Sequence, residues 1–418
     1  YYIFFVVNKK ERKNIMNDKT IDINEVNENY SQKDFQYEEN EEKEKTELRR
    51  YQINSYAVDR AIETLIKWKQ KGKMIVPEFQ RDFVWTYGNC CRFIDSVLLN
   101  LPIPNIFVFK TLEEGVEKYI LVDGMQRVTT LEQFYNGVWE QGNKTRKFKI
   151  NIKSSNWYNK AFSDLEDDDK EFFLDYSLSV MIFETSANSE TEANNVIFSV
   201  FERINTGSDK LTEQEIRNTI FQGECLAKLK ELSENNQSYI NLIDLDKSIQ
   251  KRGKNIEFLL RILTYYEILE ANSRGSIYLI DGVGESKITT SKTVMLNNYL
   301  SYANSGKIEY ISKLNDIVEA LEIINNVSSD AFYSVKRDKS GIGAKVHQIF
   351  SEALVIAIIK NNFKVNISPE EFNKNKIELW KSEEYFYTTF TEKTTEPNNV
   401  AKRINEMIKF INGEEIWN

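Results

Sequence analysis

An acid, an amide and a guanidinium lie within five residues of the chain, at Asp123, Gln126 and Arg127 in the run DGMQR. These residue types can together bind an anion or act on one, provided that the backbone holds them on one side. Gly124 follows the acid, and a glycine lets a ligand approach the main chain closely because it has no Cβ. The side chains of this run therefore predict an anion site whose geometry depends on the elements around it.

Those elements are predicted to be a strand that leads into a helix. The apolar run 119–122 is typical of a buried strand, and Val128, Leu131, Phe134 and Tyr135 fall on one face of a helix after it. A helix N-terminus at such a corner has free N–H groups and the positive end of the helix dipole, which both favour an anion. Two structural alternatives stay open. Asp123 could be the N-cap of the helix, and Arg127 could form a structural ion pair.

Composition limits the class of protein. The chain has 418 residues and a formal net charge of −9, which argues against a general basic coat but allows a local basic groove. Its three cysteines give neither a disulfide framework nor zinc spacing, and its single histidine excludes any nuclease site that needs two histidines from this chain. The apolar run 1–7 is too short to span a bilayer. We expect a cytoplasmic protein without a membrane segment, with Met16 as a candidate start.

The secondary-structure signals change near residue 190. Residues 1–47 are polar and acidic and are interpreted as a flexible tail. Residues 48–190 predict an α/β domain, with a helix from 55 to about 72, another at 88–100, strands near 148–152 and 178–183, and a helix around 157–173. Residues 191–418 predict a mostly helical domain, so the fold class is α+β. The helical segments are 191–203, 212–222, 224–235, 255–271, 292–304, 307–326, 341–361, 369–380 and 398–412.

Three further clusters have residue types suited to binding. The loop after a short strand at 74–77 has Gln80 and Arg81, although this pair could equally close the loop. The run FERINTG ends in Asn205, Thr206 and Gly207, where a glycine most simply ends a helix. A late basic loop contains Lys336, Arg337 and Lys339, which are candidate DNA contacts, although such loops are usually just solvated.

Four runs, taken in order, resemble the N-terminal domain of the GmrSD-type modification-dependent restriction proteins over roughly residues 48–220. They are VPEFQRDFVW, LPIPNIFVF, ILVDGMQRVTTL and FERINTGSDKLTEQEIRN. That family has a ParB/sulfiredoxin-like core and a DGQQR hallmark, and Met125 stands here in place of the hallmark's first glutamine. The resemblance implies binding and hydrolysis of a nucleoside triphosphate with Mg²⁺, coupled to recognition of modified DNA in anti-phage defence.

The resemblance also implies roles for individual residues. Arg127 would contact a phosphate, Asp123 would hold Mg²⁺ or orient an attacking water, and Gln126 would position that water. The residues expected to bind the nucleotide are Gln80, Arg81, Gly124, Thr129, Thr130, Asn205, Thr206 and Gly207.

Larger relatives carry a His-Asn-His nuclease domain, and residues 220–418 show no such pattern. We therefore expect a sensor or regulatory NTPase that leaves cutting to a separate nuclease or defence-system subunit. Two alternatives remain: a non-hydrolysing ParB-like DNA-binding adaptor, and a metal-dependent DNA nickase that uses the N-terminal domain.

Overall fold

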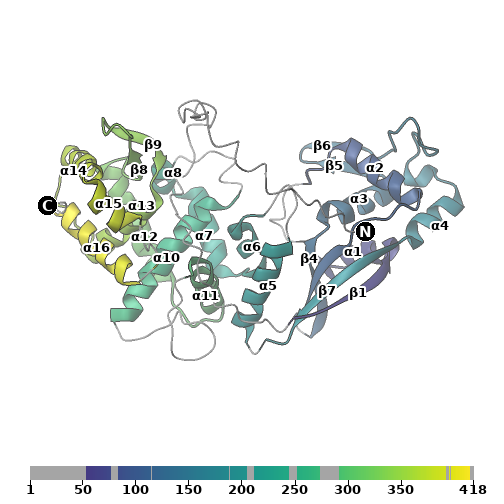
Figure 1. Cartoon of the computed structure of the whole chain (residues 1–418), viewed down its shortest axis with the longest axis horizontal. Helices are drawn as coiled ribbons and strands as arrows, with labels where there is room; N and C mark the ends of the chain where they lie inside the picture. Colours follow the sequence, from purple (N-terminus) through teal and green to yellow (C-terminus); the bar gives the residue numbers. More distant parts are fainter. Residues whose placement is uncertain are drawn as a thin grey trace, which may run out of the picture.

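The structure, a computed structural model, has an α+β fold with a sheet in its N-terminal half and helices beyond it (Figure 1). It describes residues 53–76, 83–113, 115–187, 189–204, 211–243, 252–273, 291–391, 395 and 397–414. The predicted tail at 1–47 lies outside these ranges, and so do Gln80, Arg81, Asn205, Thr206 and Gly207. Among the described helices, none combines the length and the apolar composition needed to cross a membrane.

Five strands form the main sheet, in the order β1-β7-β3-β4-β2. Their bounds are β1 Ile53–Ala61, β2 Met74–Ile75, β3 Ile106–Glu113, β4 Val116–Asp123 and β7 Ser177–Thr185. β4 pairs antiparallel with β3 and parallel with β2, so the short edge strand and β4 end at the same side of the sheet. Asp123, the last residue of β4, lies opposite Phe107 near the start of β3.

Both faces of this sheet are buried, because successive side chains of a strand point to opposite faces. Leu121 belongs to one hydrophobic core, whereas Val122 belongs to the other. The first core is covered by α1 (Ile62–Gln70), α2 (Tyr87–Leu98), α3 (Met125–Asn136) and α4 (Asp167–Asp175). The second core contains Phe198 and Phe201 of α5 (Glu190–Ile204), which packs on β4.

The helices after α5 lead into a second region, which lies on the other side of α5 and α6 from the sheet (Figure 1). They are α6 Glu213–Ile220, α7 Glu224–Asn235, α8 Gln237–Ile243, α10 Lys254–Ser273, α11 Lys292–Asn304, α12 Ile311–Val327, α13 Gln348–Lys360, α14 Pro369–Lys381, α15 Glu383–Phe390 and α16 Pro397–Ile411. A hairpin of β8 (Tyr333–Val335) and β9 (Ile342–Val346) interrupts them before α13.

The helix predicted from residue 55 was wrong at its start. Residues 53–61 form β1, which pairs with β7 over nine positions, and only residues 62–70 are helical. Pairing with the distant strand β7 stabilises residues 53–61 as a strand, although their apolar residues have helical spacing. The predicted end was right, because Gly72 has a positive φ of 63° directly after the helix.

Two other local predictions also differ from the structure. The strand expected at 148–152 is absent, and the hairpin β5 (Val138–Gln141) and β6 (Lys144–Lys147) forms just before it, around the two-residue turn Gly142-Asn143. The helix expected at 157–173 is a short 3-10 turn, η2 (Phe162–Asp164), followed by α4. The helix expected at 341–361 begins only at Gln348, because β9 occupies residues 342–346.

Candidate functional site

The predicted corner is present between β4 and α3. β4 ends at Asp123, and Gly124 is the N-cap of α3 with a φ of 107° and no side-chain cap. The first helical bond is donated by the N–H of Val128 to the carbonyl of Gly124. The N–H groups before it, of residues 125–127, have no acceptor among the described residues. Asp123 is therefore not the N-cap, and the corner offers unused donors.

Arg127 is held in place by Asp123. Its Nη2 donates to Asp123 Oδ2 at 2.7 Å, with the arginine side chain 14% exposed and the carboxylate 45% exposed. The guanidinium lies against Gly124, since a Cβ there would be 3.2 Å from Nη2 and 3.4 Å from Nε. Arg127 Nε is buried and has no hydrogen-bond partner among the described residues. A buried donor without an acceptor calls for an explanation, and an anion bound at this corner would supply one.

Gln126 has a structural partner. Its Oε1 accepts hydrogen bonds from the backbone N–H groups of Val84 and Trp85, both at 3.1 Å. Its Nε2 lies 3.7 Å from the sulfur of Met125, the residue that departs from the family hallmark. Gln126 thus anchors the loop that follows residues 77–82, and its carbonyl oxygen is already used. Its predicted role in positioning a water stays a prediction.

The two threonines of the corner do not both face it. Thr130 is fully buried, and its hydroxyl donates to the carbonyl of Gln126 at 2.7 Å. The hydroxyl of Thr130 is thus enclosed within the helix packing, and its predicted nucleotide contact stays a prediction. Thr129 is half-buried, and its hydroxyl accepts from Lys69 of α1, which also pairs with Glu132.

The donor set of the corner suits a phosphate. Gly124 leaves room for the guanidinium of Arg127 against the backbone, and the arginine fork and the helix N-terminus both favour negative charge. Asp123 supplies a half-exposed carboxylate, and Mg²⁺ in phosphate sites is commonly held by one or two carboxylates together with the phosphates themselves. Within the described part of the chain, no group of three or more metal-binding side chains is found.

The predicted DNA loop lies far from this corner. Lys336, Arg337 and Lys339 form the tip of the β8–β9 hairpin, and Figure 1 places that hairpin toward the opposite end of the long axis from β4 and α3. Asp338 lies between the cations, and hydrogen bonds from the hydroxyl and N–H of Ser340 lower its pKa. The loop's three positive charges are thus partly offset by an ionised carboxylate.

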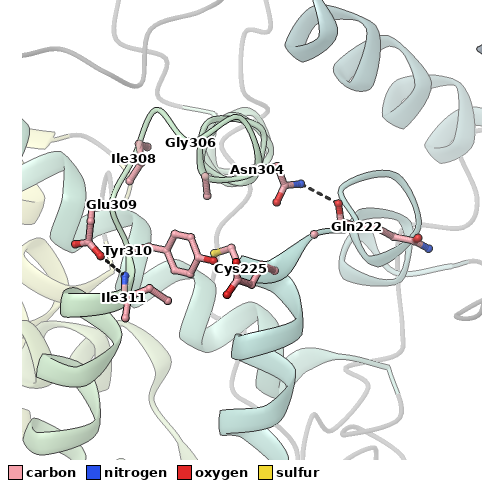
Figure 2. Close-up of a pocket in the computed structure, with 11 residues that line it drawn as sticks. Gln222, Cys225, Asn304, Gly306, Ile308, Glu309, Tyr310 and Ile311 are labelled. Carbon is pink, nitrogen blue, oxygen red and sulfur yellow. Dashed lines mark hydrogen bonds between the residues drawn. The ribbon is translucent and has the colours of Figure 1, made fainter. Parts of the chain in front are cut away.

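A separate hollow opens among the helices, with a volume of about 580 Å³. In Figure 2, the polar side chains that line this hollow point to the ends of helices. Asn304 donates to the carbonyl of Gln222 at 3.0 Å, and Glu309 accepts from the N–H of Ile311 at 2.8 Å. Burial raises the pKa of Cys225 to about 12, so the thiol stays protonated and is a poor nucleophile. These groups serve to end and begin helices, and nothing in the hollow suggests a reaction.

The sequence analysis missed a basic run beside the corner. No aspartate or glutamate occurs between Glu140 and Asp164, whereas six lysines or arginines do. The missing acids were a signal visible in the sequence, and a count of charges by segment would have found it.

Residues 62–222 match the family model of the GmrSD restriction endonuclease N-terminal domain. The match confirms the resemblance carried by the four motifs, and its range contains the corner, its loop and helices α5 and α6. A comparison with curated proteins found no match.

Proposed function

We propose that the GmrSD-type restriction domain at residues 62–222 binds the phosphates of a nucleoside triphosphate at the β4–α3 corner, as part of a defence system that acts on DNA. The observation that carries this proposal is the buried Nε of Arg127. The arginine is paired with Asp123 and lies close to Gly124, and its Nε has no acceptor among the described residues. A ParB/sulfiredoxin-like core for this domain belongs to the same proposal.

Each group of the corner would have a limited task. Arg127 and the N–H groups at the start of α3 would bind phosphate oxygens, and Gly124 would let the phosphate come close to the backbone. Asp123 would hold the Mg²⁺ that accompanies the nucleotide, which neutralises phosphate charge when bound. The predicted nucleotide contacts of Gln80, Arg81, Asn205, Thr206 and Gly207 lie outside the described residues and belong to the same proposal, in which a separate nuclease subunit would cut the DNA.

Binding without turnover is a second candidate, and Gln126 favours it. The oxygen of Gln126 accepts from two backbone N–H groups, and Met125 replaces the neighbouring glutamine of the hallmark. Neither side chain is then available to orient an attacking water. In this case the nucleotide would act as a regulatory ligand of a DNA-binding adaptor.

Nucleotide binding by Arg127 variants tests the proposal. The four triphosphates are titrated with Mg²⁺ by calorimetry, and phosphate release is followed on the same samples. Arg127→Ala should weaken binding by about 10- to 100-fold, since a hydrogen bond to a charged group contributes about 1.5–3 kcal/mol. Arg127→Lys should be intermediate, because lysine keeps the charge and loses the fork.

Arg92→Ala is the matched control, since Arg92 is an exposed arginine on α2 of the same domain. It should bind nucleotide as the wild type does. Absence of binding by the wild-type chain, or equal affinity of the wild type and Arg127→Ala, would overturn the proposal. If the chain binds nucleotide but releases no phosphate, with or without DNA, the result would favour the non-hydrolysing DNA-binding adaptor.

A further inference from the structure

The segment 141–163 is strongly basic in an acidic protein. It contains Lys144, Arg146, Lys147, Lys149, Lys153 and Lys160 and no acid, whereas the whole chain has a net charge of −9. We name these six residues the basic surface. Like charges this close repel one another, so such a surface is most stable with an anionic partner.

Most of these cations form no ion pair with the described residues. All four residues of β6 are exposed, and Lys153 is exposed as well. Among the described residues, Lys144, Lys147, Lys149 and Lys153 form no ion pair, while Lys160 pairs with Glu166 at 3.3 Å. The charges of Lys147 and Lys149 also act on Asp164, whose pKa they help to lower, whereas Lys144 and Lys153 are available for negative charges from outside.

Contacts with aromatic residues hold the hairpin and its cations in place. Arg146 stacks on Tyr87, with its guanidinium carbon 3.2 Å from the ring centre, and it also lies over Trp139. The backbone N–H of Lys149 donates to the hydroxyl of Tyr87 at 2.9 Å, and that hydroxyl donates to the carbonyl of Lys149. Packing of this kind reduces the loss of conformational freedom when a ligand is bound.

A hollow of about 470 Å³ lies beside the hairpin. Arg146 and Lys147 line one side of it, and Tyr135 and Phe162 line another, with their ring centres 5.1 Å apart. Tyr135 is 39% exposed. Cations alternating with exposed aromatic rings are typical of surfaces that follow a nucleic-acid backbone, because the cations meet phosphates and the rings meet sugars or bases.

We propose that the basic surface is the DNA-binding face of this protein and that it contacts the phosphate backbone of duplex DNA. The choice of DNA as the partner rests on the proposed function in a restriction system. The extent of the surface agrees with it, since Lys144 and Arg146 lie on the same face of an extended strand about 7 Å apart, a span that covers several phosphates of a duplex. The face replaces the β8–β9 loop as the site of DNA contact.

The basic surface lies one helix length from the nucleotide corner. The hollow includes Tyr135 at the end of α3, and twelve helical residues span about 18 Å. Trp85 connects the two places, because its N–H donates to Gln126 of the corner and its carbonyl accepts from Gln141 of β5. DNA bound at the hairpin would therefore contact elements that also shape the corner.

Two triple variants of equal charge change test the proposal. Lys144→Gln/Lys147→Gln/Lys149→Gln removes three charges from the basic surface, and Lys336→Gln/Arg337→Gln/Lys339→Gln removes three from the β8–β9 loop. Binding to a fluorescent 30-base-pair duplex is measured by anisotropy at several salt concentrations. The first variant should bind at least about 10-fold more weakly, with a salt slope smaller by roughly 2–3, because each phosphate contact contributes about 0.9 to that slope. The second should bind within about twofold of the wild type.

Two further measurements keep the outcome interpretable. Nucleotide binding should persist in the first variant and DNA binding should persist in Arg127→Ala, so that this proposal and the proposed function can fail separately. Vesicles with anionic headgroups serve as a second anionic surface. Unchanged DNA binding by the first variant, an equal loss in the second, or tighter binding to vesicles than to DNA would overturn the proposal.

Discussion

Gly124 has a backbone conformation and a neighbourhood that both require glycine. Its φ of 107° is one that residues with a Cβ rarely adopt. A Cβ at this position would also lie 3.2 Å from Nη2 of Arg127 and 3.2 Å from Cγ1 of Ile106, which is tighter than most such contacts. The position of the guanidinium therefore depends on the absence of a side chain here.

Gly124→Ala should lower the free energy of unfolding and weaken nucleotide binding. A left-handed conformation costs a residue with a Cβ about 1–2 kcal/mol, and the two close contacts add to it, so we expect a loss of about 2–3 kcal/mol. Denaturant unfolding and nucleotide titration measure the two effects. Gly115→Ala is the matched control, since Gly115 has a φ of 79° and nothing within 4 Å of a Cβ. Equal losses in the two variants would show that the contact with Arg127 is unimportant.

The site could be predicted in part from single residues. Asp123, Gly124 and Arg127 lie together as expected, because they are neighbours in sequence at a strand–helix boundary. The partners of Gln126 could not be predicted, since Val84 and Trp85 are 42 and 41 residues away. The burial of Thr130 was predictable, because it precedes the buried Phe134 by one helical turn.

At the scale of elements, the sequence predicted long helices correctly and missed short strands. The segments 224–235 and 292–304 match α7 and α11 residue for residue, because long amphipathic runs carry a strong periodic signal. The hairpins β5–β6 and β8–β9 have strands of three to five residues, too short for such a signal. β1 was mistaken for helix because its partner, β7, lies more than a hundred residues away.

The start of α13 depends on the only histidine of the chain, His347. It is the N-cap, and its Nδ1 accepts from the N–H of Phe350 at 3.2 Å. Burial lowers its pKa to about 3, with the positive charges of Lys376 and Arg403 adding to the effect. A proton on Nδ1 would remove the cap and place a charge beside two cations.

The free energy of unfolding should therefore fall as the pH drops below 6.5. His347 takes up a proton at the ordinary histidine pKa of about 6.5 in the unfolded chain, whereas its pKa in the folded chain is about 3. The stability that this contributes is complete above pH 6.5, and from pH 7.5 to pH 5.0 the loss should be about 2 kcal/mol. Denaturant unfolding at the two pH values measures it. Lys376, whose pKa burial lowers to about 7, also gains its proton in this window in the folded chain and adds to the loss. Ordinary carboxylates titrate mainly below the window.

His347→Asn separates this effect from other titrations. Asparagine is a good N-cap that cannot be protonated, although the ring contacts with Trp380 and Phe386 are lost. The variant should be less stable at pH 7.5 by about 1–2 kcal/mol, but it should lose far less than the wild type between pH 7.5 and 5.0. The same loss in both proteins would mean that other groups cause the acid sensitivity.

At the scale of the whole molecule, the core of the helical region extends through α5 and α6 onto one face of the sheet. Phe198 and Phe201 of α5 share a core with the sheet residues Phe109 and Val122, so a boundary at 190/191 would separate the sheet from the helix that covers one of its faces. We propose that α5 and α6 belong to the sheet domain, as the family match to residue 222 suggests. The division of the chain into two domains itself remains a prediction.

Arg217 connects these helices to the rest of the helical region. It is fully buried and donates to Asn297 of α11 at 3.0 Å, to Gln214 at 3.1 Å and to Glu213 at 2.8 Å. Thr293 of α11 donates to the same oxygen of Glu213 at 3.0 Å. The loss of Arg217 would leave the amide oxygens of Asn297 and Gln214 without their donor and Glu213 with only Thr293.

Arg217→Met should destabilise the helical region more than the sheet. Arg217 donates to two buried amide oxygens and to a carboxylate that is 36% exposed, and a buried acceptor left unpaired costs about 1–3 kcal/mol, so we expect a loss of about 2–4 kcal/mol. Arg217 lies over Phe198 of the helical core and not in the core beneath α1 to α4. Far-ultraviolet circular dichroism reports mainly on the helices, while tryptophan fluorescence reports largely on Trp68, Trp85, Trp139 and Trp157 of the sheet domain. The midpoint of the circular dichroism transition should therefore drop further than that of fluorescence.

Arg203→Met provides the comparison for this variant, since Arg203 is exposed near the end of α5. It should change the free energy of unfolding obtained from either signal by less than about 0.5 kcal/mol, as surface substitutions usually do. If both signals of Arg217→Met shift together, the chain unfolds as one cooperative unit, and the two-domain division is wrong. If only the helical signal shifts, the network around Arg217 is the structural link through which events at the sheet could reach the helices.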